Sequence, residues 1–143
     1  MKHHAYIDIV PLENFHMQLV YPKYREGRIG IGVLPMGLSI AQFIVRMTLL
    51  KKITDIWYAT FNGENVGLFE SRPHSNGTEI HACWFTSSRR KRLLTGMKFV
   101  EMFDDAVIFV PHDDAKGHFA LARKGILKYI GETDNVHEFR RAA

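Results

Sequence analysis

Apolar and polar residues alternate along this chain with two different periods, and each period predicts a different kind of element. Short apolar or alternating runs predict strands over 5–10, 56–61, 66–70, 78–85, 106–110 and 126–130. Apolar residues at helical spacing predict helices over 12–24, 39–52, 91–103 and 115–124. Ser39, followed three residues later by Gln42, matches a capping box at the start of the second helix. The predicted order is therefore β, α, α, β, β, β, α, β, α, β.

The connections between these elements predict a mixed sheet. Asn62 and Gly63 lie between two aromatic and β-branched runs, which is a strong signal for an antiparallel hairpin. The strand–helix–strand stretch 80–110 instead requires a parallel neighbour. We therefore expect an α/β (α+β) fold, with a mixed, mainly antiparallel sheet and helices on both faces. One domain should cover 1–131, and 132–143 should form a polar C-terminal tail.

Composition and charge narrow the class of protein without indicating one function. The 143 residues are 46% hydrophobic and 24% charged, as in an ordinary globular protein. No apolar run approaches the roughly 20 residues that span a bilayer. Cys83 is the only cysteine, which excludes an intramolecular disulfide and fits a reducing cytoplasm. The formal net charge of +4 is compatible with nucleic acid, acyl-CoA, an acidic protein surface or no anionic partner.

The stretch from 78 to 103 carries the candidate chemistry. Its strand ends in a polar turn, 86–88, and the helix after the turn begins with the cations Arg89, Arg90, Lys91 and Arg92. A helix N-terminus offers backbone N–H groups and the positive end of the helix dipole, so proteins often bind phosphate there. The same four cations are also compatible with a solvated turn or with nucleic-acid phosphates.

The strand before this turn places a carboxylate, an imidazole and a thiol on one face. Alternation assigns Glu79, His81, Cys83 and Phe85 to that face. Glu79 could act as a base, whereas side chains two residues apart on a strand are separated by roughly 7 Å, which is too far for a direct Cys–His hydrogen bond.

The eight histidines do not follow a metal-binding motif. Only His3 with His4, and His112 with His118, are near each other in sequence, and neither H-E-x-x-H nor C-x-x-C occurs. The sequence therefore predicts no metal site.

The order of elements from 5 to 130 resembles that of the GCN5-related N-acetyltransferase (GNAT) superfamily. In that superfamily the fourth strand leads into a helix through Arg/Gln-x-x-Gly-x-Gly/Ala, whose N–H groups hold the pyrophosphate of acyl-CoA. Arg89 fits the first position here, whereas Arg92 and Leu94 replace the two small residues. The resemblance implies a set of cofactor contacts formed by Phe85, Arg89, Arg90, Lys91, Arg92 and Leu94.

A second motif of the superfamily follows the fifth strand and supplies an Asn, a proton-donating Tyr and a Gly-Phe pair. The matching positions here are Asp114, Leu121, Gly125 and Ile126. Leu121 cannot protonate a departing thiolate, so the usual general acid is missing. Glu79 resembles the superfamily's amine-deprotonating Glu by its position on the strand.

The resemblance implies a GNAT-like acyltransferase layout, with acetyl-CoA or another acyl-CoA as the cofactor if the protein is active. Because the small residues and the Tyr are missing, the first hypothesis is a catalytically degenerate accessory factor. An overall likeness to acyltransferase-like proteins from head-assembly genes of short-tailed bacteriophages extends it to virion assembly or DNA delivery. Such a factor would act through a protein partner or self-association, in the host cytoplasm or the virion. The alternatives are an acyl-CoA-dependent N-acetyltransferase with an atypical pyrophosphate loop, and a nucleic-acid-binding module.

Overall fold

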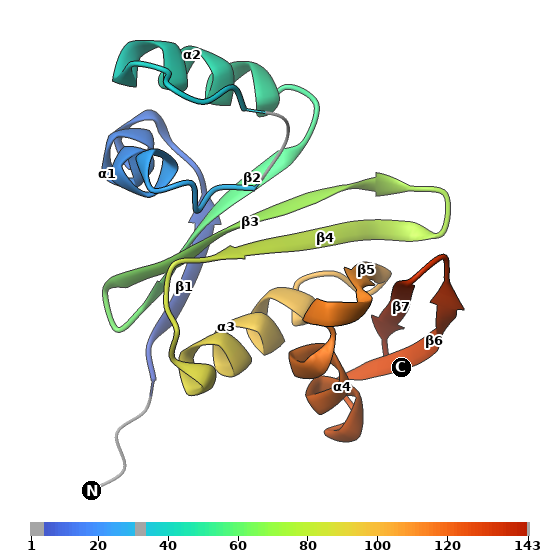
Figure 1. The fold of residues 1–143 in the computed structure, drawn as a ribbon. Coiled ribbons are helices and arrows are strands. Elements are labelled where there is room, and N and C mark those ends of the chain that lie inside the picture. Colours follow the sequence, from blue (N-terminus) through green and yellow to red (C-terminus); the bar gives the residue numbers. More distant parts are fainter. Residues whose placement is uncertain (1–4, 31–33, 143) are drawn as a thin grey trace, which may run out of the picture. The chain divides into compact units, whose positions relative to one another are not determined.

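The computed structural model describes residues 5–30 and 34–142, and Figure 1 shows the seven strands and four α-helices of this part of the chain. The strands are β1 (Ile7–Pro11), β2 (Asp55–Phe61), β3 (Glu64–His74), β4 (Gly77–Trp84), β5 (Ala106–Pro111), β6 (Leu127–Thr133) and β7 (Val136–Arg141). The helices are α1 (Asn14–Arg25), α2 (Ile40–Leu50), α3 (Arg89–Glu101) and α4 (Lys116–Arg123), with a short 3-10 helix, η1 (His112–Asp114). All ten predicted elements are present, and β7 is an additional strand.

The seven strands form one sheet in the order β1-β2-β3-β4-β5-β7-β6. Strands β4 and β5 pair in parallel, with Thr78 opposite Ala106 and Glu79 opposite Val107. The β1–β2, β2–β3, β5–β7 and β6–β7 pairs are antiparallel. The prediction of a mixed, mainly antiparallel α/β sheet is therefore confirmed.

The chain divides into two compact units, one made of Met1–Ser71 with His81–Ser88 and the other of Arg72–Ile80 with Arg89–Ala143. In the first unit, α1 and α2 lie side by side (Figure 1) and share one apolar core with β2 and β3. The fully buried members of this core are Leu12, Met17, Val20, Phe43, Met47 and Leu68. Burial of these apolar side chains is the main stabilising contribution in this unit.

Two local sequence signals in the first unit produce the expected structure. The Ser39 hydroxyl accepts the N–H of Gln42 at 3.2 Å, and the Gln42 side chain accepts the N–H of Ser39 at 2.9 Å, which completes the capping box of α2. Asn62 and Gly63 both have positive φ, 49° and 84°, as a tight hairpin turn requires. The β2–β3 hairpin is therefore confirmed.

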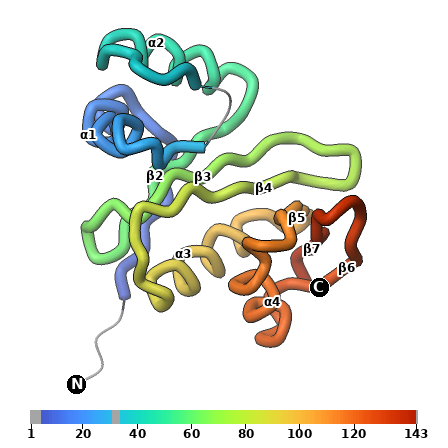
Figure 2. Tube along the Cα trace, in the orientation of Figure 1, coloured from blue at the N-terminus to red at the C-terminus, as the bar shows by residue number. Residues whose placement is uncertain are grey.

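In the second unit, residues 132–143 differ from the expected polar tail. Strand β6 extends to Thr133, and Val136–Arg141 form β7, which pairs with both β5 and β6 (Figure 2). The buried positions of β7 are His137 and Phe139. One of these two side chains is polar and the rest of the strand is mostly charged, so the apolar alternation that reveals a strand is missing.

Among the helices of the described residues, none has the length and apolar character that a bilayer crossing requires.

Candidate functional site

The predicted phosphate site lies at the start of α3, in the second unit. The helix begins with Arg89, Arg90, Lys91 and Arg92, and its first turn contains no acidic residue. The three arginines are exposed and Lys91 is half-buried. Four positive side chains therefore surround the positive end of the helix dipole, where the backbone N–H groups of a first turn point towards a ligand. This arrangement suits a compact anion of high charge.

Arg92 and Leu94, which replace the two small residues of the superfamily motif, fit a pyrophosphate site less well. Arg92 is exposed, so its long side chain is able to reach a phosphate, whereas Leu94 is half-buried. The next residue, Thr95, is fully buried, and its hydroxyl has no hydrogen-bond partner in the described part of the chain. Glycine would let a phosphate touch the backbone, and no glycine is present in this turn. The residues therefore match a pyrophosphate by charge rather than by close backbone approach.

Phe85, the other predicted cofactor contact, lies in the first unit just beyond β4. Its side chain is buried, and its N–H donates to the carbonyl of Val66 at 2.8 Å. Its carbonyl accepts a hydrogen bond from the Arg28 guanidinium at 2.7 Å. Lys23 and Arg28 both lie 6.0 Å from the centre of the Phe85 ring, within the range of a cation–π contact. These two cations were not predicted, because they come from α1 and the loop after it, some 60 residues earlier in the chain.

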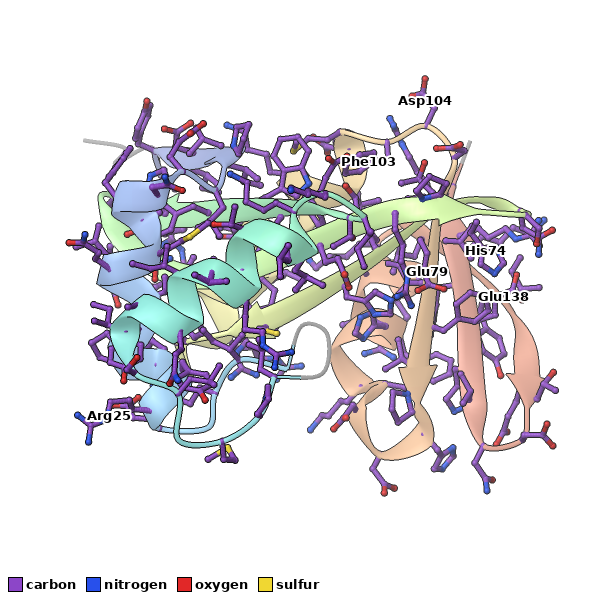
Figure 3. The ribbon with its side chains drawn as sticks, turned by 90° about the horizontal axis from the view of Figure 1, so that it is seen from above. Arg25, His74, Glu79, Phe103, Asp104 and Glu138 are labelled. Carbon is purple, nitrogen blue, oxygen red and sulfur yellow. The ribbon has the colours of Figure 1, made fainter. Side chains whose placement is uncertain are left out.

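The proposed base, Glu79, is buried on β4 in the second unit (labelled in Figure 3). Its carboxylate accepts a hydrogen bond from Arg72 Nε at 2.8 Å and a second from the same guanidinium. Arg72 lies on β3 and its side chain is half exposed. The partner stabilises the ionised carboxylate, the form that a general base must start from, and it also opposes proton uptake. A catalytic role for Glu79 stays a prediction.

The position of the missing Tyr is occupied by Leu121 of α4, which is buried. Tyr129 is the nearest aromatic residue on β6, the strand that follows α4. Its hydroxyl is 2.9 Å from His137 Nδ1. Tyr129 therefore already has a hydrogen-bond partner within the second unit.

That partner belongs to a group of ligating side chains that the sequence did not reveal. His112, Glu132 and His137 bring one ligand atom each to within 4.8 Å of one another. Glu132 and His137 face each other across the β6–β7 hairpin, whose turn residues Asp134 and Asn135 both have positive φ, 51° and 64°. In the sequence, the signal for this hairpin was an Asp-Asn pair, which can adopt positive φ but indicates a turn more weakly than Asn-Gly or Asp-Gly does. We call His112, Glu132 and His137 the histidine cluster.

The other histidines singled out from the sequence lie elsewhere. His3 and His4 lie outside the described residues. His118 is on α4, with its ring centre 5.7 Å from that of Phe139, and it is not part of the histidine cluster. Burial lowers the pKa of His118, so the neutral imidazole is favoured.

No family model and no curated protein matches this sequence. Solved structures do match over most of the chain. An acetyltransferase from Thermus thermophilus is 14% identical with a TM-score of 0.62, and the match covers 96% of this chain and 97% of the other. FdhC, a nucleotide-linked sugar GNAT, is 11% identical with a TM-score of 0.65, covering 96% and 86%. The N-acetyltransferase PseH of Campylobacter jejuni, in complex with acetyl coenzyme A, is 10% identical with a TM-score of 0.62, covering 96% and 99%.

Identities of this size show a shared fold and leave the activity of this chain to be argued from its own residues. The element order and the mixed, mainly antiparallel sheet agree with the layout expected from the sequence. This chain has a GNAT-like fold.

Proposed function

We propose that the protein binds an acyl-CoA and transfers the acyl group to an amine. The observation that carries the proposal is the first turn of α3, where four cations meet the positive end of the helix dipole without an acidic residue. A pyrophosphate concentrates negative charge in a small volume, so it is the part of acyl-CoA that this turn would hold. The GNAT-like fold supports the proposal, since PseH is an N-acetyltransferase whose structure holds acetyl coenzyme A.

The transfer replaces a C–S bond by a C–N bond and replaces an N–H bond by an S–H bond. The amine nitrogen attacks the thioester carbonyl carbon, the C–S bond breaks, and the amine loses a proton while the thiolate of CoA gains one. Glu79 is the residue proposed to accept the amine proton, with Arg72 stabilising its ionised form. Leu121 cannot supply the thiolate proton, so in this proposal that proton comes from water.

The second candidate is a protein of the same fold that does not catalyse the transfer. It is favoured by Leu121 in place of the proton donor and by Arg92 and Leu94 in place of the two small residues. Such a protein would act as an accessory factor through a partner or through self-association. A role in virion assembly or DNA delivery of a phage stays a prediction from the sequence.

Calorimetric titration with acetyl-CoA tests the proposed binding site. We expect saturable binding by the wild-type protein and a large loss in the double variant Arg89→Ala, Arg92→Ala. Each charge-assisted hydrogen bond to a phosphate contributes about 1.5–3 kcal/mol, so losing two should weaken affinity by about 100-fold or more. Lys98→Ala is the matched control, because it removes a cation from the last turn of the same helix. An equal loss in Lys98→Ala would mean that α3 binds through general positive charge.

Release of the CoA thiol in the presence of a panel of amines then separates the two candidates. Turnover that falls in Glu79→Gln, with acetyl-CoA affinity unchanged, supports the acyltransferase. Binding without turnover on any amine supports the accessory factor. No binding at millimolar acetyl-CoA would contradict the acyl-CoA site, and a salt-dependent shift with a short DNA duplex that disappears in the arginine variant would assign the turn to nucleic acid.

A further inference from the structure

The register of the second unit places two ligating side chains on one face of the sheet, and a third, His112, follows directly after β5. Val110 of β5 is paired with His137 of β7, and Glu132 of β6 is paired with the same histidine. Paired residues on neighbouring strands point to the same face, and so do residues two apart. His112 begins η1 directly after β5, and its N–H donates to the carbonyl of Asn135 at 2.9 Å, which keeps it beside β7. The histidine cluster is therefore a product of strand pairing.

A β-bulge in β6 adds the side chain of Tyr129 to this face. The β6–β7 register shifts between Tyr129 and Gly131, so that Ile130 is the extra residue. In a regular strand, Tyr129 and Glu132 would point to opposite faces, because they are three residues apart. The bulge removes this difference. Both side chains consequently lie on the face of His137, with Glu132 opposite His137 and Tyr129 opposite Phe139.

The ligand atoms of the histidine cluster are already close together. His112 Nδ1 lies 2.8 Å from His137 Nε2 and 3.8 Å from a carboxylate oxygen of Glu132. Bonds of about 2.0–2.2 Å from a tetrahedral zinc ion to nitrogen or oxygen place ligand atoms about 3.3–3.5 Å apart. His137 is buried and holds its position, whereas His112 and Glu132 are exposed and able to adjust. Small side-chain rotations would therefore bring the three atoms to coordination distance.

Tyr129 lies beside one ring nitrogen of His137, and the other ring nitrogen faces His112. Its hydroxyl lies 2.9 Å from Nδ1, and it can accept the Nδ1 proton, which leaves the lone pair on Nε2. The ring of Phe119, on α4, packs at 5.0 Å from the Tyr129 ring and 5.2 Å from the His137 ring, measured between centres. Metal-bound histidines in proteins typically have this kind of partner on their second nitrogen. The His137 ring is thus oriented as that of a metal ligand would be.

We propose that His112, Glu132 and His137 bind one divalent transition-metal ion, principally Zn²⁺. Two imidazoles and one carboxylate form a donor set of borderline softness that suits Zn²⁺, Co²⁺, Ni²⁺ or Cu²⁺ and disfavours Mg²⁺ and Ca²⁺, which prefer oxygen. Three protein ligands leave a fourth position for water. The ion would join the end of β5 to β6 and β7. This inference does not depend on the binding of acyl-CoA.

Titration of the full chain with Zn²⁺, in competition with a coloured chelator, tests the proposal. His3 and His4 are first replaced by Ala in every protein, so that two adjacent histidines do not add a second site. We expect one equivalent of Zn²⁺ to bind, and Co²⁺ to give the strong visible absorption of a tetrahedral site. Tyr129→Phe should weaken Zn²⁺ binding by about 10–100-fold, as for other partners of a ligating histidine. His112→Ala and Glu132→Gln should weaken it further.

The controls separate a built site from general attraction of zinc to histidine. His74→Ala, a histidine of the same unit outside the cluster, should leave the affinity unchanged. His112 and Glu132 are exposed, so circular dichroism should show that their variants remain folded. The proposal is overturned if the parent protein takes up no stoichiometric Zn²⁺. It is equally overturned if the double variant His112→Ala, Glu132→Gln binds Zn²⁺ as tightly as the parent does.

Discussion

The first turn of α3 and the histidine cluster both gather several functional side chains, but they do so in different ways. The four cations of α3 are consecutive in the sequence, so one helix start brings them together. His112 begins η1 directly after β5, whereas Glu132 and His137 lie on β6 and β7, and the three meet because β5, β6 and β7 pair with one another. The first turn of α3 depends on local structure, whereas the histidine cluster depends on the pairing of β5, β6 and β7. Mutations that disturb this pairing should therefore affect the histidine cluster more than the turn.

The largest effect should come from the framework on which the histidine cluster depends. Gly77 has φ +141°, and a Cβ there would lie 2.2 Å from the carbonyl oxygen of Asp105, just before β5. Gly77→Ala should therefore lower the free energy of unfolding by about 3 kcal/mol or more, through strained φ and displacement of β5. Urea denaturation measures the loss. Gly117→Ala in α4 should instead be neutral or gain up to about 1 kcal/mol, because an added Cβ would meet open space among the described residues. Equal effects of the two variants would contradict this explanation.

A smaller effect should distinguish the buried member of the cluster from an exposed one. Without metal, His137→Ala removes a buried ring that contacts Tyr129, His112 and Phe119. We expect a loss of about 2 kcal/mol in the free energy of unfolding. His112→Ala, at an exposed position, should cost less than about 0.5 kcal/mol. Thermal or urea unfolding in the presence of a chelator gives both values, and a reversed order would show that His137 is not the anchor.

The smallest effect concerns a histidine outside both sites and serves as a reference for acid sensitivity. Burial lowers the pKa of His16, whose Nδ1 accepts the N–H of Glu13 at 2.9 Å at the start of α1. The unfolded chain then binds more protons than the folded one, so stability should fall as pH drops through the ordinary histidine value of about 6.5 and level off below the folded pKa. His16→Gln keeps an acceptor in the capping box and removes the titration. It should flatten this part of the pH–stability curve, measured on metal-free protein, and an unchanged curve would assign the acid sensitivity to other groups such as His118.

Features that depend on residues close in sequence could be predicted, and features that depend on the pairing of distant strands could not. Ser39 with Gln42 and Asn62 with Gly63 act within a few residues, and both produced the structure they indicate. The start of α3 was equally visible, because a polar turn precedes a run of cations. The β7 strand was not visible, since one of the two residues that it buries is the polar His137 and only Phe139 is apolar. Without β7 the pairing of β5, β6 and β7 could not be derived, so the histidine cluster remained hidden while the cations of α3 did not. The Arg72–Glu79 pair was missed for another reason: the strand predicted over 66–70 ends before Arg72, whereas β3 extends to His74.

The position of β7 in the sheet has a consequence for how the second unit is made. It follows both of its neighbours in the sequence, yet it lies between them in the order β5-β7-β6. During synthesis, β5 and β6 therefore exist before the strand that joins them, each with an edge of unpaired backbone groups that favours association with other chains. The second unit completes its sheet only when residues 136–141 insert between β5 and β6, so slow insertion of β7 during folding would prolong an aggregation-prone state.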